Sequence, residues 1–401
     1  MLELKSKDPS LKQLVSRLAE LMVENGCEFD QSLRLEIRGA ELSYSLKGEP
    51  AVGAELLKLE QRCMPALEDY EWALDSSGQL VYQRNASEAA EHAGLHDAIV
   101  GNLVELYNRL DKVKAFANTA PAAQFYPYKS FFNSLMSVTH EKRLLASYAQ
   151  GSDAVMVEAF WQGRIFSSIN TGQVHLIPLM EFFNHSIFAR PFGWGDVKDN
   201  VRPLLLHYAP LPTDNAKSRE VFACYEIMDN LHAFAKYGFI DKASFFVQSQ
   251  PFRLEIADGL EIEVGYQSVT ANQCYAHEWA PDPLYQNSLM YRARTRWHEG
   301  RLFFPYMLVP PSRHMPAFDD ALRAQLRQIE IDRGGPSGTI ANGDSILRVK
   351  KALLKQNLQC YKELKTSAES AGFKPGMPAA KNLAAMIKHQ LGVLKDFKGA
   401  L

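Results

Sequence analysis

The sequence predicts an α+β protein in which short strands from distant segments complete one fold and the C-terminal part is mainly helical. Short runs typical of strands, separated by Gly and Pro, occupy residues 28–84 and recur at about 165–265. Between them, at about 86–160, apolar residues recur at helical spacing, and this spacing returns near the C-terminus. With 401 residues, 46% of them hydrophobic and 22% charged, the chain is long enough for two domains with sizeable cores.

The N-terminal segment is expected to form an amphipathic helix followed by strands. Asp8 precedes Pro9, which is the arrangement of an N-cap with proline in the first helical turn. Leucines then recur at helical spacing at Leu11, Leu14 and Leu18. Strands are expected in the runs SLRLEI, ELSYSL, AELLKLE and QLVYQR.

The helical block at about 86–160 is expected to be an insertion into the α+β domain. One stripe of its first helix carries four apolar residues: Ile99, Leu103, Leu106 and Leu110. Strands are expected again in GQVHLIPL, REVFACY and FRLEIADGLEIEVGY. We therefore predict one domain over residues 1–250, interrupted by this insertion, and a second over 251–401 that is helical toward its end.

The C-terminal helices are expected to expose many basic residues. One predicted helix carries Leu347, Leu354, Leu358 and Tyr361 on one seam, and the last carries Leu383, Met386 or Ile387, Leu391 and Leu394. From Asp344 onward there are eleven Lys or Arg against four Asp or Glu, an excess of seven positive charges. Two interpretations stay open: a solvated helix face, or a surface that binds an acidic partner.

The composition indicates in which compartment the protein is expected and which classes of partner it is not expected to bind. The N-terminus lacks the apolar core of a signal peptide, and no window is apolar enough for a membrane span. The five cysteines are scattered and form no C-x-x-C pair: Cys27, Cys63, Cys224, Cys274 and Cys360. We therefore expect a reducing, cytoplasmic location without a disulfide framework or a thiolate zinc site. The net charge of −2 predicts no nucleic-acid partner.

Two segments carry polar residues in an informative order. The apolar run LIPLMEFFNHS, at 176–186, leads directly into Asn-His-Ser, and REVFACYEIMDNLHAFAKYGFID follows at 219–241. Together they resemble the SET-domain methyltransferases, in the class typified by the Rubisco large-subunit lysine methyltransferases. The matching residues of the first segment are Pro178, Leu179, Glu181, Asn184, His185 and Ser186. Those of the second are Glu220, Val221, Tyr225, Asn230, Tyr237, Gly238 and Phe239.

The resemblance implies S-adenosylmethionine as the cofactor and its methyl transfer to a nitrogen, without a metal. Asn184 and the backbone of His185 would hold the cofactor, and Arg164, in the segment RIF, would pair with its methionine carboxylate. Glu181 stands where an aspartate is usual, and Glu41 falls on an acidic position of the class. The acceptor implied is a protein lysine side chain, and the basic C-terminal helices would dock that protein.

The resemblance also assigns the residues beside the transferred methyl group. Tyr237 and Tyr225 would be the catalytic residues, and Phe239 would line the substrate channel. Because these residues and Asn184 belong to one site in the class, we expect Asn184 and Tyr237 to lie close together. Without the resemblance, Asn184 would be a turn residue at a strand end and Tyr237 a core aromatic.

One motif of the class is not matched. Its Gly-x-Gly turn would fall near Glu41, where the chain reads Glu-Leu-Ser-Tyr, with Gly39 and Gly48 nearby. Three functions therefore stay open: a protein-lysine methyltransferase, a methyltransferase that acts on histidine or a small molecule, and a non-catalytic domain that binds a partner.

Overall fold

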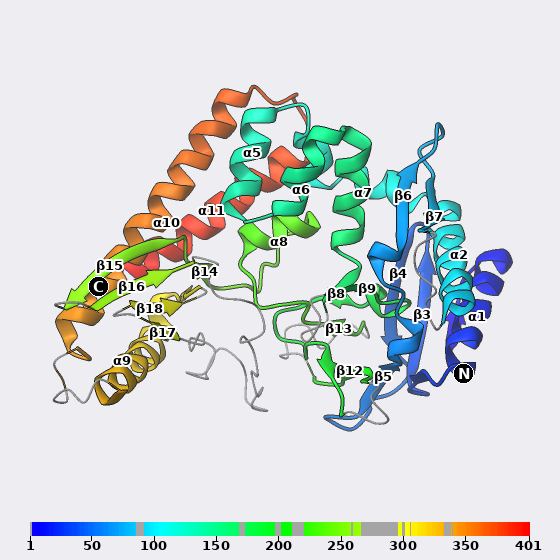
Figure 1. The fold of residues 1–401 in the computed structure, drawn as a ribbon, viewed down its shortest axis with the longest axis horizontal. Helices are drawn as coiled ribbons and strands as arrows, with labels where there is room; N and C mark the ends of the chain where they lie inside the picture. Colours follow the sequence, from blue (N-terminus) through cyan, green and yellow to red (C-terminus); the bar gives the residue numbers. More distant parts are fainter. Residues whose placement is uncertain are drawn as a thin grey trace. The chain divides into compact units, whose positions relative to one another are not determined.

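The computed structural model describes residues 2–85, 92–167, 173–196, 202–210, 220–257, 260–265, 296–298, 301–304, 306–332, 338 and 340–401. The chain forms two compact units, Met1–Tyr126 with Arg143–Ile227, and Pro127–Lys142 with Met228–Leu401. The α+β class, with short strands, a helical insertion and a mainly helical C-terminal part, is confirmed (Figure 1). The predicted domain boundary at residue 250 stays a prediction.

The first unit contains several small sheets. Its strands are β1 (Glu3–Lys5), β2 (Glu28–Phe29), β3 (Leu33–Arg38), β4 (Glu41–Leu46), β5 (Glu55–Leu59), β6 (Tyr70–Leu74), β7 (Leu80–Arg84), β8 (Ile165–Ser167), β9 (Val174–Leu176), β10 (Asn184–His185), β11 (Gly193–Trp194), β12 (Leu204–His207) and β13 (Phe222–Ala223). They form the sheets β1-β3-β4 and β11-β12-β5-β2 and the pairs β6-β7, β8-β9 and β10-β13. Because β12 pairs with β5 across the helical insertion, distant segments complete a sheet as predicted.

The helices of the first unit cover its core of apolar side chains. They are α1 (Pro9–Glu24), α2 (Ala93–Arg109), α3 (Lys112–Ala117), α4 (Pro121–Phe125), α6 (Lys142–Ser147) and α7 (Ser152–Gln162), with the 3-10 turns η1 (Gln61–Cys63), η2 (Leu67–Asp69), η3 (Tyr148–Gln150) and η4 (Met180–Phe182). The predicted cap of α1 is confirmed, since the Asp8 carboxylate accepts from the backbone N–H of Ser10 at 2.8 Å and of Leu11 at 3.2 Å. Helices α1 and α2 lie side by side (Figure 1).

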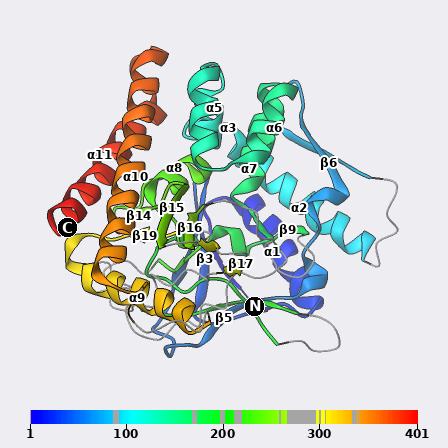
Figure 2. The ribbon, with the colours of Figure 1, turned by 60° about the vertical axis from the view of Figure 1, so that its left-hand side comes forward.

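The second unit is mainly helical and contains one larger sheet. Its elements are α5 (Lys129–Val138), α8 (Asn230–Tyr237), β14 (Val247–Gln248), β15 (Phe252–Ala257), β16 (Leu260–Val264), β17 (Arg296–His298), β18 (Arg301–Phe304), β19 (Leu308–Val309), η9 (Ser312–His314), α9 (Met315–Asp332), α10 (Gly343–Ala371) and α11 (Pro378–Gly399). Helix α5, from the predicted insertion, packs against α10, and α10 packs against α11 (Figure 2). Within the described residues, no helix has the length and apolar character that crossing a bilayer requires.

The buried seam of α10 differs from the predicted one. Leu347 and Leu358 are only half-buried, whereas Val349, Lys350 and Asn357 are buried. The spacing of the leucines predicts the wrong buried face because two polar residues, Lys350 and Asn357, lie on the face that is buried. Both have partners there: the Lys350 ammonium pairs with a carboxylate on α9 at 2.9 Å, and the Asn357 amide donates to a backbone carbonyl at 2.8 Å.

Candidate functional site

The run from Leu176 to Ser186 is not the single strand that its apolar character suggests. Strand β9 ends at Leu176, η4 follows, and Asn184 begins the separate short strand β10. Pro178 has no N–H to continue a ladder, and the buried Leu179 adopts a φ of 63°. A leucine in this region of backbone space carries strain on the order of 1–3 kcal/mol, and such strain often occurs beside functional sites.

Three predicted site residues meet at the start of β10. The Asn184 amide donates to the Glu220 carboxylate, from a position 36 residues away in the sequence. The backbone N–H of Tyr225 donates to His185 Nδ1 at 3.2 Å, and the Tyr225 hydroxyl donates to the Phe183 carbonyl at 2.5 Å. These contacts accompany the parallel pairing of β10 with β13. The structure therefore brings Asn184, His185 and Tyr225 close together.

One carboxyl oxygen of Glu181 accepts no hydrogen bond from the described residues. Its Oε1 accepts from the Tyr107 hydroxyl at 2.5 Å. Its Oε2 is inaccessible to solvent and has no hydrogen-bond partner among the described residues. Burial raises the pKa of Glu181 to about 7, although the hydrogen bond from Tyr107 acts in the opposite direction. A buried acceptor of this kind is costly unless a donor satisfies it.

Arg164 lies among aromatic rings close to Glu181. Its guanidinium carbon is 3.8 Å from the centroid of the Phe160 ring and 5.7 Å from that of the Tyr107 ring. Its Nη1 donates to the Phe160 carbonyl at 2.5 Å. Burial lowers the pKa of Arg164, and the nearby Tyr107, Glu181 and Tyr225 oppose this shift. The arginine remains charged, so the site contains a fixed cation beside a carboxyl group.

Lys112, the first residue of α3, belongs to the same cluster. Burial, followed by repulsion from Arg164, lowers the pKa of its ammonium to about 8. Glu41 and Glu181 are the charges that oppose this shift. The predicted residues Glu41, Arg164 and Glu181 are thus electrostatically coupled through a lysine that the motifs did not indicate. We call Arg164, Glu181 and Lys112 the charged cluster.

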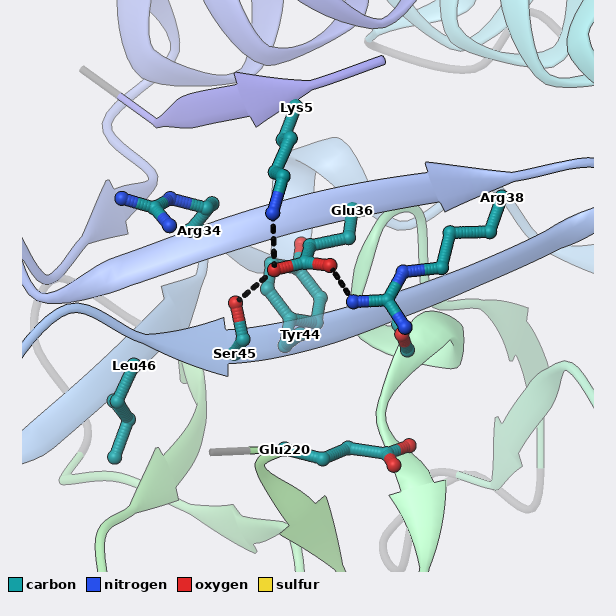
Figure 3. A pocket seen from close by; sticks show the side chains of 9 residues that line it. Lys5, Arg34, Glu36, Arg38, Tyr44, Ser45, Leu46 and Glu220 are labelled. Carbon is teal, nitrogen blue, oxygen red and sulfur yellow. Dashed lines mark hydrogen bonds and ion pairs between the residues drawn. The ribbon is translucent and has the colours of Figure 1, made fainter. Parts of the chain in front are cut away.

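Glu220 also lines a polar cavity of about 310 Å³ (Figure 3). The carboxylate of the buried Glu36 occupies its centre, where it accepts from Ser45 at 3.0 Å and pairs with Arg38 and, at 3.7 Å, with Lys5. The charges on its walls are therefore largely paired within the protein. The cavity provides a polar environment for Glu220, the partner of Asn184.

Tyr237 and Phe239 lie together in the second unit. Tyr237 is the last residue of α8, which Gly238 ends with a φ of 80°. The rings of Tyr237 and Phe239 are stacked, with centroids 5.7 Å apart and an interplanar angle of 29°. The expected proximity of Tyr237 to Asn184 joins residues of the two units and stays a prediction.

Sequence reasoning missed two members of the site. Tyr107 had a detectable signal, because it lies in the same helix as Leu103 and Leu106 and is fully buried there. A phenol on a buried helix face needs a hydrogen-bond partner, which here is Glu181. Lys112 had no such signal, because its surroundings come from residues distant in the sequence.

No protein-family model matches this chain, and no curated protein shows significant similarity to it. Solved structures are similar to it. The SET domain of LSMT bound to lysine and AdoHcy is 13% identical, with a TM-score of 0.40, over 98% of this chain and 91% of that chain. Its complex with MeLysine and AdoHcy is 12% identical, with a TM-score of 0.42 and the same coverage. Rubisco LSMT bound to AdoMet is 12% identical, with a TM-score of 0.38, over 96% and 91%. The proteins named belong to the class that the motifs resemble.

Proposed function

We propose that this protein transfers a methyl group from S-adenosylmethionine to a nitrogen acceptor, namely a protein lysine side chain. The charged cluster is the observation that carries the proposal. The amino-acid end of S-adenosylmethionine has one ammonium and one carboxylate group. Arg164 and Lys112, which are only half-buried, would pair with the carboxylate, and the ammonium would lie near the carboxyl group of Glu181. The residues present therefore fit the cofactor.

The neighbouring residues support methyl transfer by position and by exclusion of water. Bound S-adenosylmethionine supplies an electrophilic methyl group. The Tyr225 ring lies 5.2 Å from the His185 ring, and its hydroxyl is anchored on the Phe183 carbonyl, so this wall is held rigidly. Alignment of the acceptor nitrogen and exclusion of water are what such a displacement requires of a protein. Tyr237 and Phe239 would complete the acceptor channel.

The basic faces of α10 and α11 support a protein as the acceptor. Six exposed lysines have no ion pair among the described residues: Lys351, Lys355, Lys362, Lys381, Lys388 and Lys395. On each helix they lie opposite the buried stripe. We propose that these faces dock an acidic surface of the substrate protein.

A non-catalytic binding domain is the second candidate, and two observations favour it. The Asn184 amide donates to Glu220 within the protein, so this donor is occupied. The turn between β3 and β4 contains Gly39 at a φ of 62°, but Glu41 begins β4 close to where the class has its Gly-x-Gly turn. Binding of the cofactor separates this candidate from the enzyme.

Calorimetric titration with S-adenosylmethionine tests the proposal. We expect the wild-type protein to bind it, and Asn184→Ala to weaken binding by about 1–3 kcal/mol because the cofactor loses the hydrogen bonds of this amide. Asn102→Ala is the matched control. It removes an amide on α2 whose oxygen accepts a hydrogen bond from Arg17 of α1. Absence of binding to the wild-type protein at high micromolar cofactor would exclude both methyltransferase hypotheses. An unchanged affinity in Asn184→Ala would assign Asn184 a purely structural role.

Replacing Tyr237 by phenylalanine tests the catalytic assignment. The change removes one hydroxyl and keeps the ring, so we expect cofactor affinity to persist while transfer of labelled methyl groups to extract proteins falls by tenfold or more, about 1.4 kcal/mol of barrier per tenfold. Tyr225→Phe is the comparison, since its hydroxyl bonds a backbone carbonyl. If Tyr237→Phe loses stability and cofactor binding together, Tyr237 is a core residue. If the labelled methyl groups appear in small molecules or on histidine, the acceptor is not a lysine side chain.

A further inference from the structure

Two buried thiols lie next to each other at the end of α1. Cys27 and Cys63 are 2% and 0% exposed, and both are free. The Cys27 sulfur accepts from the backbone N–H of Glu60 at 3.4 Å, and the Cys63 thiol donates to the Asn25 carbonyl at 3.9 Å. Each sulfur therefore contacts the backbone of the segment that carries the other cysteine.

The strands beside the thiols fix this approach. β2 begins directly after Cys27 and pairs antiparallel with β5, which ends four residues before Cys63. The backbone N–H of Cys63 donates to the Glu60 carbonyl at 2.9 Å, which closes η1. The backbone geometry thus brings the two cysteines together from segments that are far apart in the sequence.

The two thiols are chemically unequal. The neighbouring Cys63 thiol, followed by burial, raises the pKa of Cys27. The Cys27 thiol in turn lowers the pKa of Cys63, burial opposes this shift, and the charge of Arg62 adds to the lowering. The Arg62 guanidinium folds back over Gly26, with Nη2 3.1 Å from the position that a Cβ there would occupy. Of the two thiols, Cys63 is therefore the more easily ionised.

We propose that Cys27 and Cys63 are a peroxide-sensitive pair that forms an intramolecular disulfide. The Cys63 thiolate attacks a peroxide oxygen and becomes a sulfenic acid, while the O–O bond breaks and one water leaves. The Cys27 sulfur then displaces the hydroxyl from Cys63, the S–S bond forms and a second water leaves. Two thiols are oxidised by two electrons, and one hydrogen peroxide is reduced to two waters. In a reducing compartment such a bond is reversible and regulatory.

The position of the pair links it to the candidate site. The carbonyl of Arg62 bonds His96 Nε2 on α2 at 3.0 Å, and that of Met64 bonds His175 Nδ1 on β9 at 3.0 Å. Strand β9 begins the run that leads to Asn184. A disulfide would thus fix the turn that supports this run. The chemistry of the pair does not depend on the proposed function.

Peptide mapping after treatment with hydrogen peroxide tests the proposal. We expect a Cys27–Cys63 cross-link with a mass loss of about 2 Da, reversed by dithiothreitol and formed on the order of tenfold faster than oxidation of Cys224 or Cys360. Cys224 and Cys360 are internal controls because they are also buried. If the wild-type map shows no Cys27–Cys63 cross-link, or links either residue to another cysteine, the proposal is wrong.

Two serine variants test the assigned roles. In Cys27→Ser, oxidation should stop at a Cys63 sulfenic acid that dimedone traps, whereas in Cys63→Ser dimedone should label neither position. Equal labelling of Cys27 in Cys63→Ser would overturn the assignment of the nucleophile. Cys224→Ser is the matched control and should cross-link as the wild-type protein does. The wild-type map decides the proposal even if a serine variant fails to fold.

Discussion

Replacing Asp229 by alanine is expected to destabilise the second unit by about 3–5 kcal/mol. Asp229 is fully buried and caps α8. One of its oxygens accepts from the backbone N–H of His232 at 3.0 Å and from its Nδ1 at 2.7 Å. The other accepts from the backbone N–H of Gln248 at 2.9 Å and from the Tyr361 hydroxyl at 3.4 Å. The truncation removes this acceptor from four donors, of which the Tyr361 hydroxyl also lies 3.4 Å from Gln390 Oε1, and each lost hydrogen bond costs free energy.

The loss is measured by urea denaturation together with hydrogen exchange of the α8 amides. Asp229→Asn is the comparison variant. Its amide oxygen can retain the cap of α8, whereas its NH2 group cannot accept from Gln248 or Tyr361, so we expect a smaller loss than in Asp229→Ala. Tyr361→Phe removes a hydroxyl that lies 3.4 Å from both Asp229 Oδ2 and Gln390 Oε1, and it should cost about 1 kcal/mol. A loss below about 1 kcal/mol in Asp229→Ala would show that water replaces the carboxylate and that the network does not hold α8 in place.

Raising the pH from 5 to 7.5 is expected to reduce the stability that Glu181 contributes to the first unit by about 2 kcal/mol. The pKa of Glu181 rises from 4.5 to about 7 in the folded protein, chiefly through burial. Between these values the folded state holds a proton that the unfolded state has lost. The contribution of Glu181 is therefore fully present below pH 4.5 and is lost as the pH rises through about 7.

Comparison with Glu181→Gln isolates this effect. Glutamine cannot ionise, so the wild-type protein should lose more stability than the variant over the same pH range in urea denaturation. The difference between the two proteins is needed because His96 titrates in both of them. Burial lowers the pKa of His96, and this shift raises the stability of both proteins as the pH increases. Lys112 titrates near pH 8 and influences only the upper end of the range. Parallel pH profiles for the two proteins would show that water or a structural change solvates the Glu181 carboxylate.

Local patterns in the sequence predicted most of the fold. The Asp8 cap and the leucines after it predicted α1, and the apolar stripe through Leu103 predicted α2. The runs around β3, β4, β5 and β7 predicted these strands. Such elements are readable because their hydrogen bonds and buried faces repeat every two to four residues. Where polar residues lie on a buried face, as Lys350 does on α10, the pattern misplaces that face.

The sequence by itself determined most of the helices and strands, the α+β class and the motif residues Asn184, His185 and Tyr225, but not the break between β9 and β10. Only the tertiary structure decided what these residues contact: Asn184 bonds Glu220, and the carboxyl of Glu181 is left with one oxygen unpaired. The same holds for Asp229, which meets Tyr361 across 132 residues of sequence. Helices and strands follow from neighbours in the chain, whereas burial, hydrogen-bond partners and pKa values follow from segments that packing brings together.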